Sequence, residues 1–123
     1  MFTLDATTKT IELILDAVKT TTDADYTVCY YDVPSRAKEN NTDYRLAHKD
    51  GVTNGTTLVT AVAAPGQNVS RNIVSLSIYN ADNAAIDVTV RVDTGGTKRI
   101  LVKQTLNPTD TLFYEDGRGW VII

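Results

Sequence analysis

The clearest pattern in this chain is an alternation of apolar and polar side chains in its second half. The alternation runs unbroken through Ile86, Asp87, Val88, Thr89, Val90, Arg91, Val92 and Asp93. Successive side chains of a β-strand point to opposite faces of its sheet, so a period of two residues predicts a strand. We expect one face of this strand to be buried and the other to face water.

Six further segments are rich in β-branched and aromatic residues and end at turn-forming residues, which predicts strands there as well. They cover residues 26–33, 56–64, 71–79, 99–106, 111–114 and 119–123. Leu58 and Val62 share one face of their segment, and Val74, Leu76 and Ile78 alternate with Ser75 and Ser77. In the segment 99–106 we predict that Ile100, Val102 and Leu106 face inward.

The N-terminal segment 3–18 fits two patterns. The alternation of a strand is present at Ile11, Leu13 and Leu15. The spacing of one helical face is also present, at Ile11, Ile14, Leu15 and Val18. Threonines on both sides of the segment disfavour a helix, because β-branched residues lose side-chain freedom there. We therefore predict a strand.

Turn signals separate these segments at intervals of about 8–12 residues, which is typical of a β-sandwich or barrel. They fall at residues 65–66, 94–97, 107–110 and 116–118. The polar stretch 34–55 predicts a long loop. We expect a single domain spanning residues 1–123, an all-β antiparallel β-sandwich that is jelly-roll-like and has about eight short strands.

Size and composition narrow the classes of function. A chain of 123 residues is one domain and can bury a core without disulfides or metal. The single cysteine and single histidine exclude an internal disulfide and a four-ligand Cys/His zinc site. The net charge of −3 argues against a nucleic-acid-binding surface. No apolar run reaches the roughly 18 residues of a membrane span, and no signal peptide is recognisable, so we expect synthesis in the cytoplasm.

His48 is the side chain whose charge would change near neutral pH. Asp43 and Asp50 lie near it in the sequence, but no Ser or Cys stands in the context of a nucleophile. An exposed loop histidine is the simpler interpretation. The adjacent carboxylates Glu115 and Asp116 are better explained by turn formation than by acid–base catalysis.

Oxygen ligands from loops can bind a hard cation such as calcium. The candidate ligands are Asp82, Asn83, Asp93 and Asp110, and their spacing does not match a calcium-binding loop. We therefore assign no catalytic residue, no cofactor and no metal ligand.

The aromatic side chains allow two interpretations. The set comprises Tyr26, Tyr30, Tyr31, Tyr79, Phe113, Tyr114 and Trp120. Some must fill the core of so small a sandwich, and tyrosines at strand positions also suit a subunit interface. The alternative is a stacking platform for sugars or bases.

A set of short motifs extends from the middle of the chain to its end. It comprises Thr53-Asn54-Gly55-Thr56-Thr57, Ala63-Ala64-Pro65, Val74-x-Leu76-x-Ile78-Tyr79-Asn80-Ala81-Asp82, Ile86-x-Val88-Thr89-Val90-Arg91, Arg99-Ile100-Leu101 and Leu106-x-Pro108-x-Asp110-Thr111-Leu112-x-Tyr114-x-Asp116-Gly117-x-Gly119-Trp120. Together with the segment 4–33, this set resembles small virion structural proteins of tailed bacteriophages. The resemblance covers most of the chain except residues 34–50.

The resemblance implies a β-sandwich that joins the virion in repeated copies, most specifically as a capsid decoration (cement) protein. Such a protein binds the lattice of the major capsid protein and stabilises the shell through many weak contacts. Decoration proteins of this size commonly form trimers, so a homo-oligomer is expected. We predict contacts from the N-terminal segment 1–20 and the loop 34–55, with interface residues Phe2, Leu4, Tyr30, Tyr44 and Trp120.

Two other functions remain open. Related β-domains also serve as tail-fibre or adaptor components of the virion. A carbohydrate-binding module is the alternative from another class, and it would need an exposed cluster of the aromatic residues Tyr30, Tyr79, Tyr114 and Trp120.

Overall fold

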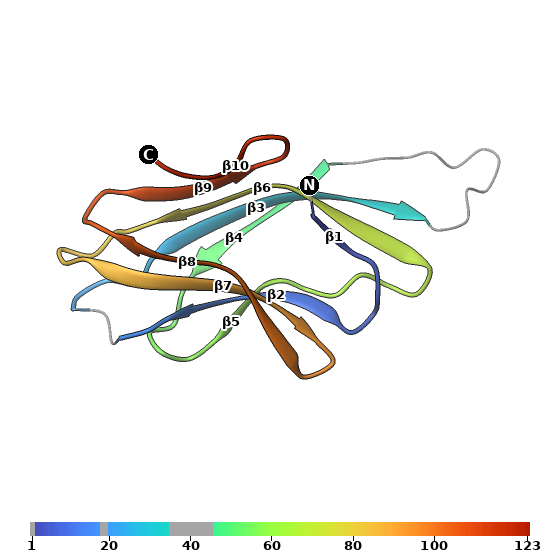
Figure 1. Ribbon diagram of the computed structural model, residues 1–123, viewed down its shortest axis with the longest axis horizontal. Coiled ribbons are helices and arrows are strands. Elements are labelled where there is room, and N and C mark those ends of the chain that lie inside the picture. Colours follow the sequence, from blue (N-terminus) through green and yellow to red (C-terminus); the bar gives the residue numbers. More distant parts are fainter. Residues whose placement is uncertain (1, 18–19, 35–45) are drawn as a thin grey trace.

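Two antiparallel β-sheets pack face to face in the computed structural model (Figure 1), which describes residues 2–17, 20–34 and 46–123. The predicted all-β sandwich is thereby confirmed. Among the residues described, no helical segment has the length and apolar character that crossing a bilayer requires.

The strands are β1 (Phe2–Leu4), β2 (Lys9–Leu15), β3 (Asp25–Pro34), β4 (Leu46–Val52), β5 (Val59–Val62), β6 (Val69–Tyr79), β7 (Ile86–Thr94), β8 (Thr97–Leu106), β9 (Thr111–Glu115) and β10 (Gly119–Ile122). The six-stranded sheet has the order β10-β9-β6-β3-β4, and β1 also pairs with β6. The four-stranded sheet has the order β5-β2-β7-β8.

Strands β1 and β9 lie end to end along the same edge of β6. β1 pairs with residues 71–73 of β6 and β9 pairs with residues 75–79, while β3 occupies the opposite edge. Beyond β9 the sheet continues with β10, but beyond β1 no described strand follows. The six-stranded sheet is therefore one strand narrower at the end that holds β1.

Consecutive strands mostly alternate between the two sheets. Among the ten described strands, the consecutive pairs β3–β4, β7–β8 and β9–β10 each remain within one sheet, and the other connections cross from one layer to the other. The β7–β8 hairpin closes through Gly95 and Gly96, which both have positive φ (58° and 100°). Glycine tolerates this conformation, and it fits the tight turn that the sequence predicted at 94–97.

Alternate residues of the strands fill a single core between the layers. Its fully buried members include Leu4, Ile11, Leu13, Leu15, Val28, Ile73, Leu76, Ile78, Val88, Leu106 and Leu112. The inward face predicted for β7 is confirmed, since Ile86, Val88 and Val90 are buried, but Thr89 of the predicted wet face is buried as well. β2 is a strand and not a helix, as predicted, and its buried apolar residues Ile11, Leu13 and Leu15 follow the period of two.

The predicted inward position of Ile100 is wrong, because a β-bulge inverts the alternation in β8. Val102 pairs with Val90, but Ile100 and not Leu101 pairs with the next residue, Arg91. Leu101 is therefore the extra residue of the bulge. Beyond it Ile100 points outward and is 65% exposed, while Arg99 pairs with inward-facing Val92.

A second bulge has the same effect in β6. Cys29 of β3 pairs with Ser75 and the following Tyr30 pairs with Ile73, which leaves Val74 as the extra residue. Leu76 and Ile78 are fully buried as predicted, but Val74 is only half-buried and Ile73 takes its place in the core. Leu58 precedes β5 and is exposed, so it does not share the buried face of Val62.

The loop predicted for residues 34–55 is shorter than expected, because β4 lies within it. Among the described strands β4 pairs only with β3 and forms the edge of the sheet, and most of its side chains are exposed, so it carries no hydrophobic alternation for sequence reasoning to find. Gly51 of β4 lies against Tyr26 of β3, where a Cβ atom would come within 2.6 Å of the tyrosine hydroxyl. Residues 35–45 are outside the described part.

Candidate interaction surfaces

A network of ion pairs covers the outer face of the four-stranded sheet. Glu12 at its centre is only 4% exposed and accepts hydrogen bonds from Arg91 (2.8 Å) and Lys98 (2.8 Å). Lys98 also pairs with Asp93 at 3.1 Å. Lys98 donates a hydrogen bond to each carboxylate, which raises the pKa of Lys98 and lowers the pKa of Asp93.

The same network continues toward the other end of the sheet. Lys103 pairs with Asp16 at 2.6 Å, and Thr89 donates a hydrogen bond to the same carboxylate. Thr105 donates a hydrogen bond to Asp87. The acidic and basic groups of this face therefore compensate one another within the chain, which leaves little charge to recognise a partner.

The outer face of the six-stranded sheet differs in composition. One cross-strand row runs from β10 to β4 through Val121, Phe113, Ser77, Thr27 and Asp50. The next rows contain Glu115, Ser75, Cys29 and His48 on one side, and Thr111, Tyr79, Asp25 and Val52 on the other. We call these thirteen residues the six-stranded outer face.

This face carries apolar and hydroxyl groups with acidic residues at intervals, and none of its thirteen residues is a lysine or arginine. Tyr79 is 38% exposed and Val52 is 56% exposed, while Phe113 and Val121 are half-buried. Short serines in the centre leave these larger side chains free to contact another surface. Two aromatic residues, Tyr79 and Phe113, thus lie on a face whose only charged groups among the thirteen are the carboxylates Asp25, Asp50 and Glu115, and aromatic residues are enriched in protein–protein interfaces.

An ion pair joins β6 to β3 at one end of the sandwich interior. Arg71 of β6 donates two hydrogen bonds to Asp32 of β3, at 2.8 and 3.0 Å, and a third to the carbonyl oxygen of Ala63. Its guanidinium carbon also lies 4.5 Å from the ring centre of Tyr30. The hydrogen bonds to the carboxylate raise the pKa of Arg71. Tyr30 is therefore covered by a cation that is already paired.

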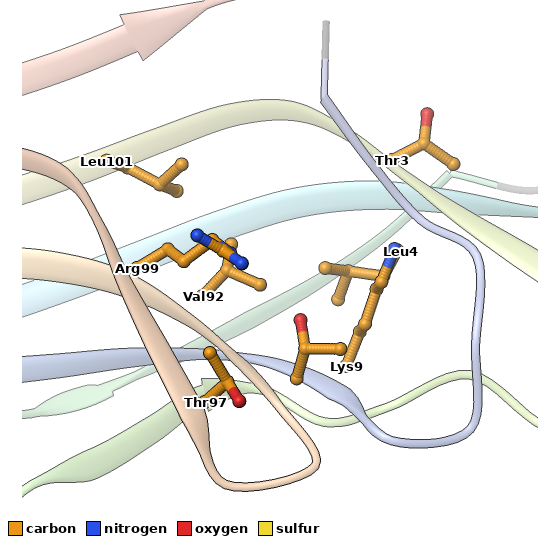
Figure 2. A pocket seen from close by; sticks show the side chains of 8 residues that line it. Thr3, Leu4, Lys9, Val92, Thr97, Arg99 and Leu101 are labelled. Atoms are coloured by element: carbon orange, nitrogen blue, oxygen red, sulfur yellow. The ribbon is translucent and has the colours of Figure 1, made fainter.

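A cavity of about 430 Å³ opens between β1 and the β7–β8 hairpin, where the six-stranded sheet is narrow (Figure 2). Leu4, Val92 and Leu101 form its apolar part. Figure 2 shows Arg99 and Leu101 projecting from β8 on one side, with Leu4 and Lys9 on the other.

The polar lining of this cavity is basic. It consists of Lys9, Arg99 and the three threonines Thr3, Thr94 and Thr97, with no acidic residue among the lining side chains. Lys9 bonds to the exposed Asp5 at 2.5 Å. In the described part of the chain Arg99 has no ion pair or hydrogen-bonded side chain. The guanidinium of Arg99 therefore lines the cavity without a charged partner among the described residues.

The predicted interface residues are placed in different environments. Leu4 is 1% exposed and belongs to the core. Trp120 packs against the core and stacks on Tyr114, with ring centres 5.0 Å apart and planes tilted by 47°. Phe2 lies in β1, where its Cα is paired with that of Ile73. Tyr44 lies outside the described residues. An interface role for these residues stays a prediction.

The four aromatic residues of the carbohydrate-binding alternative do not form one exposed cluster. Tyr114 is buried beside Trp120, and Tyr30 lies beneath Arg71 on the inner side of the sheet. Tyr79 is on the outer face of the same sheet. The structure therefore divides these rings between two sides of the sheet.

His48 lies in β4 and not in a loop, and its side chain is exposed as expected. The sheet places it directly opposite Cys29, a neighbour that sequence separation concealed. Asp50 lies two residues along the same face, and Asp43 is outside the described residues. Glu115 ends β9 and Asp116 begins the turn to β10, as the turn interpretation predicted.

The Asp82 carboxylate has a structural role. It accepts hydrogen bonds from the backbone nitrogens of Thr20, Thr21 and Asn83 and from the Thr21 hydroxyl, which lower its pKa from 3.8 to about 2. In residues 2–17, 20–34 and 46–123, no three His, Cys, Asp or Glu side chains are grouped so that they could hold a metal ion.

Comparison of the chain with protein-family models, with curated proteins and with solved structures finds no match.

Proposed function

We propose that this protein is a non-enzymatic structural component of a tailed-bacteriophage virion, and specifically a capsid decoration protein that binds the lattice of the major capsid protein. The composition of the six-stranded outer face is the observation that supports this proposal most directly. Its aromatic and hydroxyl side chains suit packing against another protein, and the motifs that resemble virion proteins supply the identity of the partner.

The contrast between the two outer faces supports this choice of surface. The charges of the four-stranded sheet are compensated internally around Glu12, so desolvating that face would disturb existing ion pairs. The six-stranded outer face presents Tyr79, Phe113 and Val121 around Ser77, and its one ion pair among the described residues joins Glu115 to Arg118 of the β9–β10 turn at 3.8 Å. Many copies, each bound weakly through this face, would together stabilise a shell.

Immunogold electron microscopy of phage particles tests the location. Antibody raised against the recombinant protein is expected to label the heads evenly. Label confined to one vertex or to the tail would contradict decoration and would favour an adaptor or fibre component. Analytical ultracentrifugation of the recombinant protein tests the accompanying proposal of a homo-oligomer, with a trimer expected.

A pair of variants tests the surface. Ser77→Arg places a long cation in the centre of the six-stranded outer face and is expected to weaken binding to particles that lack the protein by about tenfold or more. Thr60→Arg makes the same charge change at an exposed residue of β5 in the four-stranded sheet, where Thr60 pairs with Glu12 of β2, and should bind like the parent chain. Equal loss in both variants, or in neither, would reject this surface.

A further inference from the structure

We propose that the cavity between β1 and the β7–β8 hairpin is a second binding site, which accepts an extended segment of a partner polypeptide as an added strand beside β1. The segment would present apolar side chains and one carboxylate to the cavity. This site lies at the open side of the sandwich, separate from the six-stranded outer face.

The backbone of β1 provides the place for such a strand. β1 pairs with β6 along one edge, and within the described residues nothing pairs with its other edge. Alternate N–H and C=O groups of an edge strand point away from its neighbour and can pair with an incoming chain. An added strand would take the position beside β1 that β10 takes beside β9.

The opposite layer presents side chains to the position that an added strand would take. The bulge at Leu101 turns Arg99 and Thr97 toward the space between the sheets, where their partners in β7 are Val92 and Thr94. Leu101 remains 37% exposed, although it lines the cavity. A strand beside β1 would cover Leu101 as β9 and β10 cover the rest of the core.

The charges of the cavity determine the chemistry of its occupant. Arg99 has no acidic partner in the described residues, and Lys9 is the second cation. Arg99 is exposed, and a carboxylate placed beside it would form a charge-assisted hydrogen bond with the guanidinium. The cations and the leucines lie on the same side, so the carboxylate and the apolar groups of the occupant must occupy alternate positions along its strand.

Calorimetric titration of the intact protein with a synthetic peptide tests the inference. The probe is an end-capped peptide, Thr-Val-Thr-Glu-Thr-Val-Thr, whose Val, Glu and Val face one side of a strand. We expect saturable binding with a Kd below about 1 mM. We also expect amide NMR shifts that are concentrated in β1 and β8. A version with Lys in place of Glu, and a version N-methylated along its pairing edge, should each bind at least about tenfold more weakly.

Matched variants separate this site from general effects. Arg99→Glu should weaken binding of the acidic probe at least about tenfold and favour the lysine probe, whereas Arg118→Glu makes the same charge change on the β9–β10 turn without effect. Leu101→Asp should abolish binding, and Ile100→Asp on the opposite face of β8 should not. Each variant is checked for an unchanged thermal midpoint.

Three results would overturn the inference. The first is no binding of the acidic probe up to about 1 mM. The second is equal binding to the parent chain and to Arg99→Glu. The third is binding of dodecanoate without binding of the peptide, which would assign the cavity to a small amphiphilic anion.

Discussion

At the scale of single residues, buried polar side chains of this protein act mainly as connectors between segments that are distant in the sequence. The Asn80 side chain donates hydrogen bonds to the carbonyl oxygens of Ala84 and Leu106, and its Oδ1 accepts the N–H of Asp82. Asp82 in turn receives the backbone N–H groups of Thr20 and Thr21. One loop thereby holds the ends of strands from both sheets.

The Asp82 carboxylate makes a pH-dependent contribution to stability. Its pKa is about 2 in the folded protein against an ordinary 3.8, so the contribution is fully present above pH 3.8 and is lost as the pH falls toward 2. Urea unfolding of the parent chain and Asp82→Asn from neutral pH downward should show a difference in free energy of unfolding that shrinks over this range. A difference that persists undiminished at pH 2 would contradict the role.

Gly51 is required because Tyr26 fills the space that a side chain would need. A Cβ atom there would approach the tyrosine hydroxyl to 2.6 Å. Gly51→Ala is expected to lower the free energy of unfolding by about 1–3 kcal/mol through overpacking. Gly66→Ala, where no atom lies within 4 Å of the added methyl group, should change it by less than about 0.5 kcal/mol. Denaturant titration compares the two.

At the scale of strands, β1 is part of the folded core although it is short. Leu4 is 1% exposed, so Leu4→Ala should cost about 2–5 kcal/mol of unfolding free energy. Thr3→Ala, on an exposed side chain that bonds to Asn72, should cost less than about 1 kcal/mol. Similar small losses in both variants would show that β1 is not anchored. Deleting β1 would therefore change stability as well as binding, so point variants are the better test of its role in binding.

The outer face of the four-stranded sheet gives a second prediction at this scale. Glu12→Ala removes a buried carboxylate and leaves Arg91 and Lys98 without it, so unfolding free energy should fall by about 2 kcal/mol or more. Lys103→Ala breaks an exposed pair with Asp16 and should cost less than about 0.5 kcal/mol. Thermal and urea unfolding of both variants measure the difference. Equal effects would mean that burial of Glu12 contributes little.

At the scale of the whole molecule, the two proposed binding sites differ in electrostatics. The six-stranded outer face has no lysine or arginine among its thirteen residues, whereas the cavity depends on Arg99 and Lys9. Raising salt from about 0.05 to about 0.5 M should weaken peptide binding in the cavity more than particle binding, because salt screens the charge pairs on which the cavity depends. A steep salt dependence of particle binding would assign it to charged residues instead.

The sequence by itself determined the class of fold and most of the strands. The alternation at 86–93, the Gly95-Gly96 turn and the C-terminal hairpin each depend on neighbours within about ten residues, and local chain geometry is enough to predict them. The buried positions of Leu76, Ile78 and Leu106 followed from the same period.

Only the tertiary structure decided the features on which binding depends. The bulges at Val74 and Leu101 arise from pairing between strands, and each one inverts the alternation beyond it, which no local period reveals. β4 is held by β3 and has no hydrophobic pattern of its own. The cavity at Arg99 lies where β1 and β9 share one edge of β6 and, among the described strands, only β9 has a further neighbour, a relation among segments far apart in the chain.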